Sequence, residues 1–213
     1  MGSHYNSEYF TWQNRTAVWG ADADRWKFDG YSDPSYTVLD WGCGGGFELE
    51  NLPAKERWGV DINPAARAEA NSRIVAVESI ADLPSGLMFD LIISNHALEH
   101  VTDPFSVLCE LRKRLKSDGT IVFVTPLDKR SGKWNPQKAD INQHLYTWTP
   151  LLLGNLFTLA GYRVIAVELF AHTWFPMSKR LHRYLPRAFF DFGCSAWGIL
   201  SGTRQLRIVA RRE

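Results

Sequence analysis

The sequence predicts an α/β fold: a doubly wound, mostly parallel sheet of seven strands, Rossmann-like, with helices on both faces. Three observations carry this prediction. From residue 37 onward, strand-like apolar runs alternate with helical patterns. Several runs are continuous in Val, Ile and Leu, which is typical of strands buried on both faces. Four glycines follow the first run, where a strand should pass into a helix.

Composition and length narrow the class of protein. The 213 residues suit one domain with a sizeable core, and 45% apolar with 22% charged residues indicate a globular chain. No signal peptide and no uncharged apolar run of transmembrane length is recognised. The three cysteines, Cys43, Cys109 and Cys194, lack CxxC or His/Cys ligand spacing. We therefore expect a cytoplasmic protein with neither a disulfide framework nor a metal site.

The elements are predicted in chain order. Aromatic and polar side chains over residues 1–35 indicate an N-terminal helical cap. The core, residues 36–170, is followed by a helical insertion over 171–203 and a last strand within 204–213. Apolar runs place strands at 37–41, 57–61, 73–77, 89–94, 120–125, 163–169 and 205–210. Helical spacing places helices at 64–71, 104–115 and 149–160, and Ser117-Asp118-Gly119 is expected to end the second.

Two segments break the alternation. Residues 127–143 are polar and follow a strand, so a mobile loop is predicted there. The insertion at 171–203 interleaves aromatic residues with Lys179, Arg180, Arg183 and Arg187. It is a candidate lid, or its aromatic side chains pack it onto the sheet. For the basic stretch three interpretations stay open: peripheral contact with a membrane, recruitment of an anionic acceptor, or an ordinary solvated helix face.

The glycine cluster at residues 42, 44, 45 and 46 is a candidate ligand loop. Glycines at a strand-to-helix turn let the backbone approach a ligand, and open α/β sheets bind ligands at the carboxyl ends of their strands. A dinucleotide fingerprint GxGxxG would need its third glycine at position 47, which is Phe47, and Asp40 directly ends the first strand. Both features argue against a dinucleotide. Asp61 ends the second strand and can accept hydrogen bonds from two ribose hydroxyls, but nicotinamide enzymes use an acid at similar spacing.

Residues 39–46, Leu-Asp-Trp-Gly-Cys-Gly-Gly-Gly, resemble the first motif of class I S-adenosylmethionine-dependent methyltransferases. Later family motifs have counterparts in order and spacing at residues 81–84, 89–94, 97–104, 111–120, 144–147 and 159–162. The resemblance spans about 38–170 and is nearest to the small stand-alone methyltransferases that act on metabolites. It implies S-adenosylmethionine as the cofactor and S-adenosylhomocysteine as its product.

The resemblance also implies a set of cofactor-binding residues. Asp40, Gly42, Cys43, Gly44 and Gly46 would shape the methionine side, Asp61 would bind ribose and Ile62 would pack on adenine. Ile80 and Ala81 would hold adenine through backbone groups and packing, and Asn95 and His96 would face the sulfonium. Many family members carry an acid where this chain has Ser79. Whether Asp82 takes over that adenine contact stays open.

Candidate catalytic and acceptor residues are fewer. His144 follows the predicted loop, and with an ordinary pKa near 6.5 it could act as a general base; substrate positioning and a structural hydrogen bond are the alternatives. His100 is expected to hold the turn that follows it. Trp12, Tyr146 and His172 are candidates for the acceptor pocket.

The function expected from these residues is methyl transfer from S-adenosylmethionine to a small-molecule or a lipid- or sugar-linked acceptor. Two alternatives stay open: a nicotinamide-dependent oxidoreductase and a non-catalytic S-adenosylmethionine-binding module. A net charge of +1, with no Asn/Asp-Pro-Pro-Tyr/Phe signature after the fourth strand, argues against a nucleic-acid acceptor. The oligomeric state and the methylated atom are not fixed by the sequence.

Overall fold

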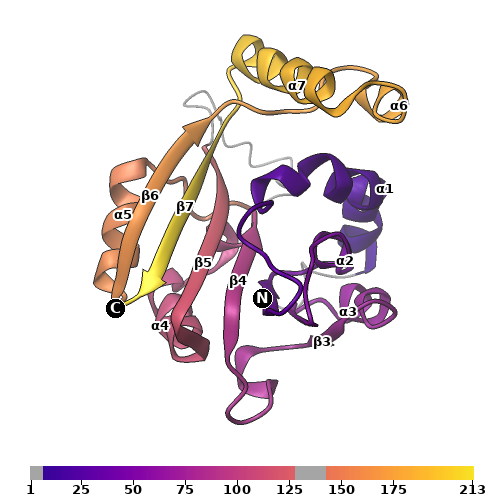
Figure 1. Cartoon of the computed structure of the whole chain (residues 1–213). Coiled ribbons are helices and arrows are strands. Elements are labelled where there is room, and N and C mark those ends of the chain that lie inside the picture. The colour runs from indigo at the N-terminus through magenta and orange to yellow at the C-terminus, as the bar shows by residue number, and fades with distance from the viewer. Residues whose placement is uncertain (1–6, 128–142) are drawn as a thin grey trace.

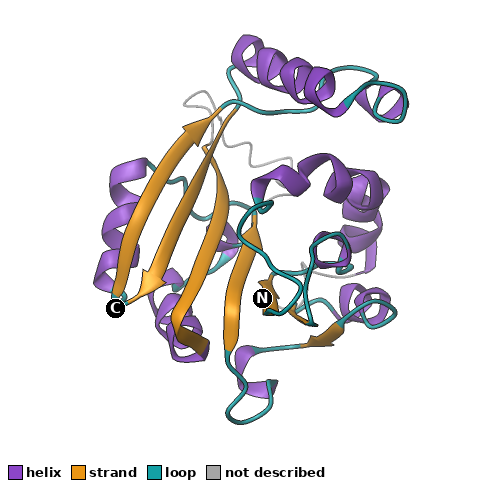
Figure 2. Ribbon diagram, in the orientation of Figure 1, coloured by secondary structure: helices purple, strands orange, loops and turns teal. Residues whose placement is uncertain are grey.

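A computed structural model describes residues 7–127 and 143–213, and it contains the predicted seven-stranded sheet (Figures 1 and 2). The strand order is β3-β2-β1-β4-β5-β7-β6, with β7 antiparallel to both neighbours and the other pairs parallel. The strands are β1 Thr37–Trp41, β2 Glu56–Val60, β3 Val75–Val77, β4 Phe89–Asn95, β5 Leu115–Leu127, β6 Tyr162–Phe170 and β7 Arg204–Arg212. The doubly wound α/β prediction is confirmed. The predicted loop at 127–143 lies almost wholly outside the described residues.

The helices lie close to their predicted places. They are α1 Ser7–Asp24, α2 Phe47–Glu50, α3 Pro64–Ala70, α4 Pro104–Arg114, α5 Pro150–Leu159, α6 Ser178–Leu181 and α7 Arg187–Ser201. Short 3₁₀ turns cover Arg25–Lys27, Ile80–Asp82 and Leu98–His100. Three helices begin in the same way: proline is the first helical residue, and the side chain before it accepts a backbone amide proton. These N-cap residues are Asn63, Asp103 and Thr149.

One predicted boundary is wrong. Ser117-Asp118-Gly119 does not end a helix, because α4 already stops at Arg114 and β5 runs from Leu115. Leu115 is fully buried and pairs with Phe89, whereas Thr120 pairs with Leu91, so the residues between them bulge out of the ladder. Because Leu115 is buried and paired with Phe89, β5 begins before the turn residues 117–119 and not after them.

The sheet carries a hydrophobic core on each face. Alternate residues of the central strands point to opposite sides: Leu39, Ile92 and Phe123 belong to one cluster, and Val38, Leu91 and Val122 to the other. The first cluster is covered by α4 and α5 through Leu108, Leu111, Leu153 and Phe157. The second is covered by Phe28 from the segment after α1, by Leu49 of α2 and Leu52 just after it, and by Ala70 of α3.

The N-terminal helix and the 171–203 segment pack on each other beyond the carboxyl ends of the strands. Ala23 of α1 lies in a small buried cluster with Phe190 and Cys194 of α7, and the Trp19 and Trp174 rings are 4.3 Å apart. β6 and β7 pair along their length, from Tyr162 with Arg212 to Phe170 with Gln205. The segment that carries α6 and α7 therefore begins and ends at neighbouring points of the sheet (Figure 1). Among residues 7–127 and 143–213, no helix is long and apolar enough to cross a membrane.

The two-sided core predicts a difference between two otherwise matched leucines. Leu108 of α4 is fully buried, whereas Leu151 of α5 is 71% exposed. Leu108→Ala should lower the free energy of unfolding by about 2–5 kcal/mol, because it removes buried methyl groups and leaves a cavity. Leu151→Ala should change it by less than about 0.5 kcal/mol. Urea unfolding measures both, and equal effects would contradict the assignment of α4 to the core.

Candidate functional site

The glycine loop is fastened to the second strand. Gly42 N and Cys43 N both donate to the Val60 carbonyl, at 2.7 and 3.1 Å, and Gly44 N donates to Asp61 Oδ2 at 2.8 Å. Gly42 has φ +82°, and a Cβ there would lie 2.5 Å from Ala97 Cβ. Only glycine fits this position, so the loop is held open at the carboxyl ends of β1 and β2.

Cys43 serves this loop through packing. A Cβ on Gly59 would lie 2.5 Å from the Cys43 sulfur, which shows how closely the thiol rests on β2. Burial, followed by the nearby Asp40 carboxyl, raises the pKa of the Cys43 thiol far above its usual range. The side chain is therefore a neutral thiol at physiological pH.

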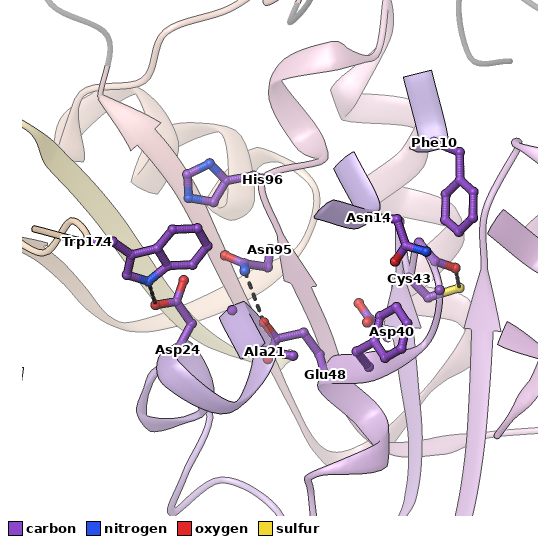
Figure 3. A pocket seen from close by; sticks show the side chains of 15 residues that line it. Phe10, Asn14, Ala21, Asp24, Asp40, Cys43, Glu48, Asn95, His96 and Trp174 are labelled. Atoms are coloured by element: carbon purple, nitrogen blue, oxygen red, sulfur yellow. Dashed lines mark hydrogen bonds between the residues drawn. The ribbon is translucent and has the colours of Figure 1, made fainter. Parts of the chain in front are cut away.

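A cavity of about 200 Å³ lies between the glycine loop, α1 and the end of β4 (Figure 3). Of the residues predicted to bind the cofactor, the structure brings six to its wall: Asp40, Gly42, Cys43, Gly44, Asn95 and His96. From the cap, α1 contributes Phe10, Asn14 and Ala21, and Trp174 closes another side. The N-terminal helix thus forms part of the wall of this cavity.

Asp61 lies next to this wall. Its two oxygens accept from Gly44 N and Asn63 N, both at 2.8 Å. Burial raises its pKa, although both hydrogen bonds and the Arg67 charge act in the opposite direction. A carboxylate has about four acceptor positions, so two remain for further hydroxyl donors.

Other predicted cofactor residues lie outside the residues that line this cavity. Gly46 has φ +77° and caps α2, where a Cβ would lie 3.0 Å from Ile74. Ile62 is 51% exposed just beyond β2. Ile80 and Ala81 form the 3₁₀ turn before β4. Asp82 Oδ2 accepts from Ser79 N at 3.0 Å and from Ser79 Oγ at 2.7 Å, so this carboxylate caps the turn that contains Ile80 and Ala81.

Sequence reasoning missed Glu48. It lies in the first turn of α2 and its Oε1 accepts from Asn95 Nδ2 at 3.3 Å, while Oε2 is buried with no hydrogen-bond partner in the described structure. Burial raises its pKa well above the usual range, and the nearby Asp24 and Asp40 carboxyls add to that. Three acidic side chains, Asp24, Asp40 and Glu48, therefore line one cavity. In the sequence, the position of Glu48 just after the glycine loop could have identified it as a site residue.

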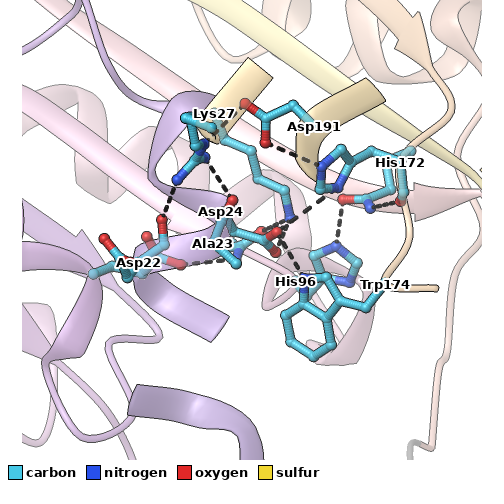
Figure 4. A network of polar contacts seen from close by, with 12 residues as sticks. Asp22, Ala23, Asp24, Lys27, His96, His172, Trp174 and Asp191 are labelled. Carbon is cyan, nitrogen blue, oxygen red and sulfur yellow. Dashed lines mark hydrogen bonds and ion pairs between the residues drawn. The ribbon is translucent and has the colours of Figure 1, made fainter. Parts of the chain in front are cut away.

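A second cavity of about 260 Å³ adjoins the first at Asn95 and His96. It is lined by Asp24, Lys27, Asn95, His96, Thr173, Trp174 and Gln205. Lys27 is 1% exposed, and its ammonium donates to Asp24 Oδ2 at 2.8 Å and to Asn95 Oδ1 at 3.4 Å (Figure 4). Burial by itself would raise the pKa of Asp24, but the ammonium of Lys27 outweighs it and holds that pKa below the usual range.

His96 sits between the two cavities with a fixed tautomer. Gln205 Nε2 donates to the His172 carbonyl at 2.7 Å, which turns Gln205 Oε1 toward His96 Nε2 at 3.0 Å. We therefore assign the ring proton to Nε2 and the lone pair to Nδ1. Burial, followed by the charge of Lys27, lowers the pKa of His96 to about 4, so the ring is neutral at pH 7. Its backbone, at φ +56°, is left-handed, a conformation that few residues other than glycine adopt.

His144, the predicted catalytic residue, lies among other polar groups. Its ring meets that of His100 edge-on, 4.9 Å between centroids, and the donor atoms of Glu99, His100 and His144 all lie within 4.8 Å of one another. The segment is held because Leu145 N and Tyr146 N both donate to the Glu99 carbonyl. Such a grouping of possible metal ligands was not expected from the sequence. His144 is not among the described residues that line either cavity.

Two of the three predicted acceptor residues, Tyr146 and His172, have described side chains, and these have different surroundings. Tyr146 donates through its hydroxyl to the Thr102 carbonyl at 3.0 Å and stacks on Trp148. His172 is 2% exposed; its Nδ1 is 3.8 Å from Asp24, and its carbonyl holds Gln205 beside the second cavity. Trp12 belongs to α1, but its side chain is outside the described parts of the structure.

The raised pKa of Asp40 predicts a pH-dependent stability. Burial, reinforced by the Asp61 carboxylate, raises the pKa of Asp40 to about 8, whereas an unfolded aspartate has a pKa of about 3.9. Between these values the folded protein holds a proton that the unfolded chain releases, so stability falls as pH rises from about 4 to about 8. Relative to Asp40→Asn, the wild-type protein should lose up to about 1.4 kcal/mol per pH unit across that window. Urea unfolding at a series of pH values checks this; parallel profiles would contradict the assigned proton.

Parts of this chain are similar in sequence to known methyltransferases. A mitochondrial ubiquinone biosynthesis O-methyltransferase from Candida albicans is 30% identical over 118 residues, covering 48% of this chain and 36% of that protein. A tRNA U34 carboxymethyltransferase from Shewanella amazonensis is 32% identical over 125 residues, covering 50% of this chain and 37% of that protein. The matched stretches thus cover less than two fifths of these two relatives.

Solved structures share the fold at lower identity. The Haemonchus contortus phosphoethanolamine N-methyltransferase 2, in complex with S-adenosylhomocysteine, matches with a TM-score of 0.62 at 14% identity, covering 95% of this chain and 59% of that chain. The [4+2]-cyclase SpnF matches with a TM-score of 0.64 at 16% identity, covering 90% and 80%. The family described as "Methyltransferase domain" matches residues 8–167. The chain belongs to this methyltransferase-domain family, in its class I, S-adenosylmethionine-dependent form.

Proposed function

We propose that this protein transfers the methyl group of S-adenosylmethionine to a small polar group of a small-molecule or a lipid- or sugar-linked acceptor. The observation that carries the proposal is the pair of cavities that meet at Asn95 and His96. The first is walled by the glycine loop and suits the cofactor. The second adjoins it and is lined mostly by polar side chains, as a second reactant requires.

The charges of the first cavity fit the methionine end of the cofactor. S-adenosylmethionine supplies an electrophilic methyl group on a positively charged sulfur, next to an amino acid ammonium. Burial, followed by neighbouring carboxyl groups, raises the pKa values of Asp40 and Glu48, so a cationic ligand would favour their charged forms. Asp61 would bind the ribose. A dinucleotide would bring an anionic pyrophosphate toward these carboxyls, which supports the methyltransferase over the nicotinamide alternative.

The second cavity limits the chemical class of acceptor that would fit. Its volume of about 260 Å³ and its lining of Lys27, Thr173 and Gln205 suit a compact, hydrogen-bonding group. The names of the relatives include an O-methyltransferase of ubiquinone biosynthesis and a tRNA enzyme. The small polar cavity and the net charge of +1 favour a small hydroxyl- or amine-bearing moiety over tRNA.

His96 is the residue we assign to proton transfer. It lines both cavities and is neutral at pH 7, and its lone pair is on Nδ1 because Nε2–H donates a hydrogen bond to Gln205 Oε1. As the acceptor oxygen or nitrogen gains the methyl group, its proton would pass to Nδ1. Lys27 and Asn95 would orient the acceptor. His144 is the alternative base; in that case the proton would pass to the group formed by Glu99, His100 and His144.

Cofactor choice is tested by thermal shift. S-adenosylhomocysteine should raise the melting temperature and NADH should not; stabilisation by NADH alone would refute the proposal. Asp61→Ala should weaken S-adenosylhomocysteine binding by about 10²-fold or more, because charge-assisted hydrogen bonds to ribose are lost. Asp103→Ala is the matched control: it removes another carboxylate that accepts a backbone amide, at the N-cap of α4. It should lower stability and leave the affinity unchanged.

The proton acceptor is tested by comparing two histidines. Asn tolerates the left-handed backbone of residue 96 but cannot take up a proton, so His96→Asn isolates the proton-transfer role. With any acceptor that supports release of S-adenosylhomocysteine, His96→Asn should lower kcat by about 10²-fold or more. Its affinity for S-adenosylhomocysteine should change little. His144→Asn should retain most turnover; if it alone abolishes turnover, the base is His144.

A further inference from the structure

The outward face of α7 is apolar and exposed. Phe189, Phe192, Ile199 and Leu200 are 69%, 73%, 60% and 78% exposed. They are spaced i, i+3, i+10 and i+11, so they form one stripe along a 15-residue helix. Such a row of large apolar side chains in water marks an interaction surface.

The opposite face of α7 fixes this orientation. Phe190, Cys194 and Gly198 are buried. A Cβ on Gly198 would lie 2.8 Å from His172 N, so the helix is closely packed on the 172–175 segment. Thr173 N donates to the Cys194 carbonyl at 3.2 Å. The apolar stripe therefore cannot turn inward without breaking this packing.

Positive charge accompanies the stripe. Lys179 and Arg180 of α6 and Arg183 in the following turn are exposed and precede α7 at the same end of the molecule (Figure 1). The acidic residue of this segment, Asp191, is paired with Arg187 at 2.8 Å. Arg187 also donates to the Asp22 and Ala23 carbonyls. The stripe and the exposed cations Arg180 and Arg183 that precede it in the chain are here called the α6–α7 surface; of these two cations, Arg183 also borders a cavity that Asp22 of α1 lines.

We propose that the α6–α7 surface docks on an anionic lipid bilayer, with α7 lying in the interface. Aromatic and aliphatic side chains beside cations are the features of an interfacial helix, and anionic headgroups supply the complementary charge. A symmetric dimer through the same surface would bring two cationic patches together, which disfavours a second copy as the occupant. The exposed stripe itself contains no charged side chain that would have to enter the acyl region.

Docking there would bring the second cavity close to the bilayer. Trp174 lines both cavities and directly follows Thr173, which is hydrogen-bonded to α7. If the proposed function holds, an acceptor with a lipid anchor could reach the cavity while its tail stays in the membrane. This last step rests on the proposed function, whereas the docking itself does not.

Vesicle co-sedimentation of the full chain tests the docking. The protein should sediment with vesicles of equal phosphatidylcholine and phosphatidylglycerol, and at least about tenfold more weakly with phosphatidylcholine alone. Phe189→Ser/Phe192→Ser should weaken binding about tenfold or more, through loss of inserted apolar area. Arg180→Glu/Arg183→Glu should weaken it by a similar factor.

Two matched controls separate the surface from general effects. Leu151→Ser/Leu159→Ser replaces equally exposed leucines of α5, at 71% and 74%. Lys55→Glu/Arg163→Glu makes the same change in net charge at exposed positions elsewhere. Both should bind as the unaltered chain does. Absence of binding to anionic vesicles, or equal losses in the controls, would overturn the proposal.

Sedimentation velocity without lipid tests whether a second copy of the chain binds this surface instead. A stable dimer that Phe189→Ser/Phe192→Ser dissociates, with no vesicle binding, would make the surface a protein interface and refute membrane docking. Vesicle binding needs neither cofactor nor acceptor. Failure of methyl transfer would therefore leave it intact, and failure of docking would leave S-adenosylhomocysteine binding intact.

Discussion

The buried ion pair between Lys27 and Asp24 joins three parts of the chain that are distant in sequence. Lys27 also donates to Asn95 at the end of β4, and Asp24 also accepts from Trp174 Nε1 at 3.2 Å. The pair therefore joins the cap, the central strand and the segment leading to α7 around the same space, and Asp24 lines both cavities. Removing one partner of a buried pair leaves an uncompensated charge, which typically costs about 3–5 kcal/mol. The cap is consequently an integral wall of the site.

Much of the fold could be predicted, because buried parallel strands and proline-capped helices leave strong local patterns. All seven strands were anticipated, and the start of β5 was missed because burial of Leu115 overrode the turn residues that follow it. The glycine loop was readable from a motif that the backbone geometry requires. Asp24 and Lys27 were not, because an acid and a lysine three residues apart look like a solvated surface pair. Lys27 donates to Asn95, which is 68 residues away in the sequence, and no local pattern reports such a contact.

The sheet by itself does not determine the chemistry. A [4+2]-cyclase and an N-methyltransferase both match this chain with similar TM-scores. What distinguishes one protein on this fold from another is the set of side chains at the carboxyl ends of the strands. Here that set is acidic around the glycine loop and neutral at His96, and it includes the buried ammonium of Lys27. This distribution of charge suits a cationic methyl donor on one side and a proton-releasing acceptor on the other.

Because Phe170 and Gln205 are paired, the chain leaves β6 and enters β7 at nearly one point. Everything between them is an excursion from the tip of a β-hairpin. Lengthening such an excursion adds little to the entropy of closing it, and it leaves the register of the sheet untouched. The segment that carries Trp174 and α7 can therefore diverge in length and composition while the strands that shape the glycine loop stay constant. A change in the length of this segment would therefore alter the wall that Trp174 adds to both cavities and leave the wall made by the glycine loop in place.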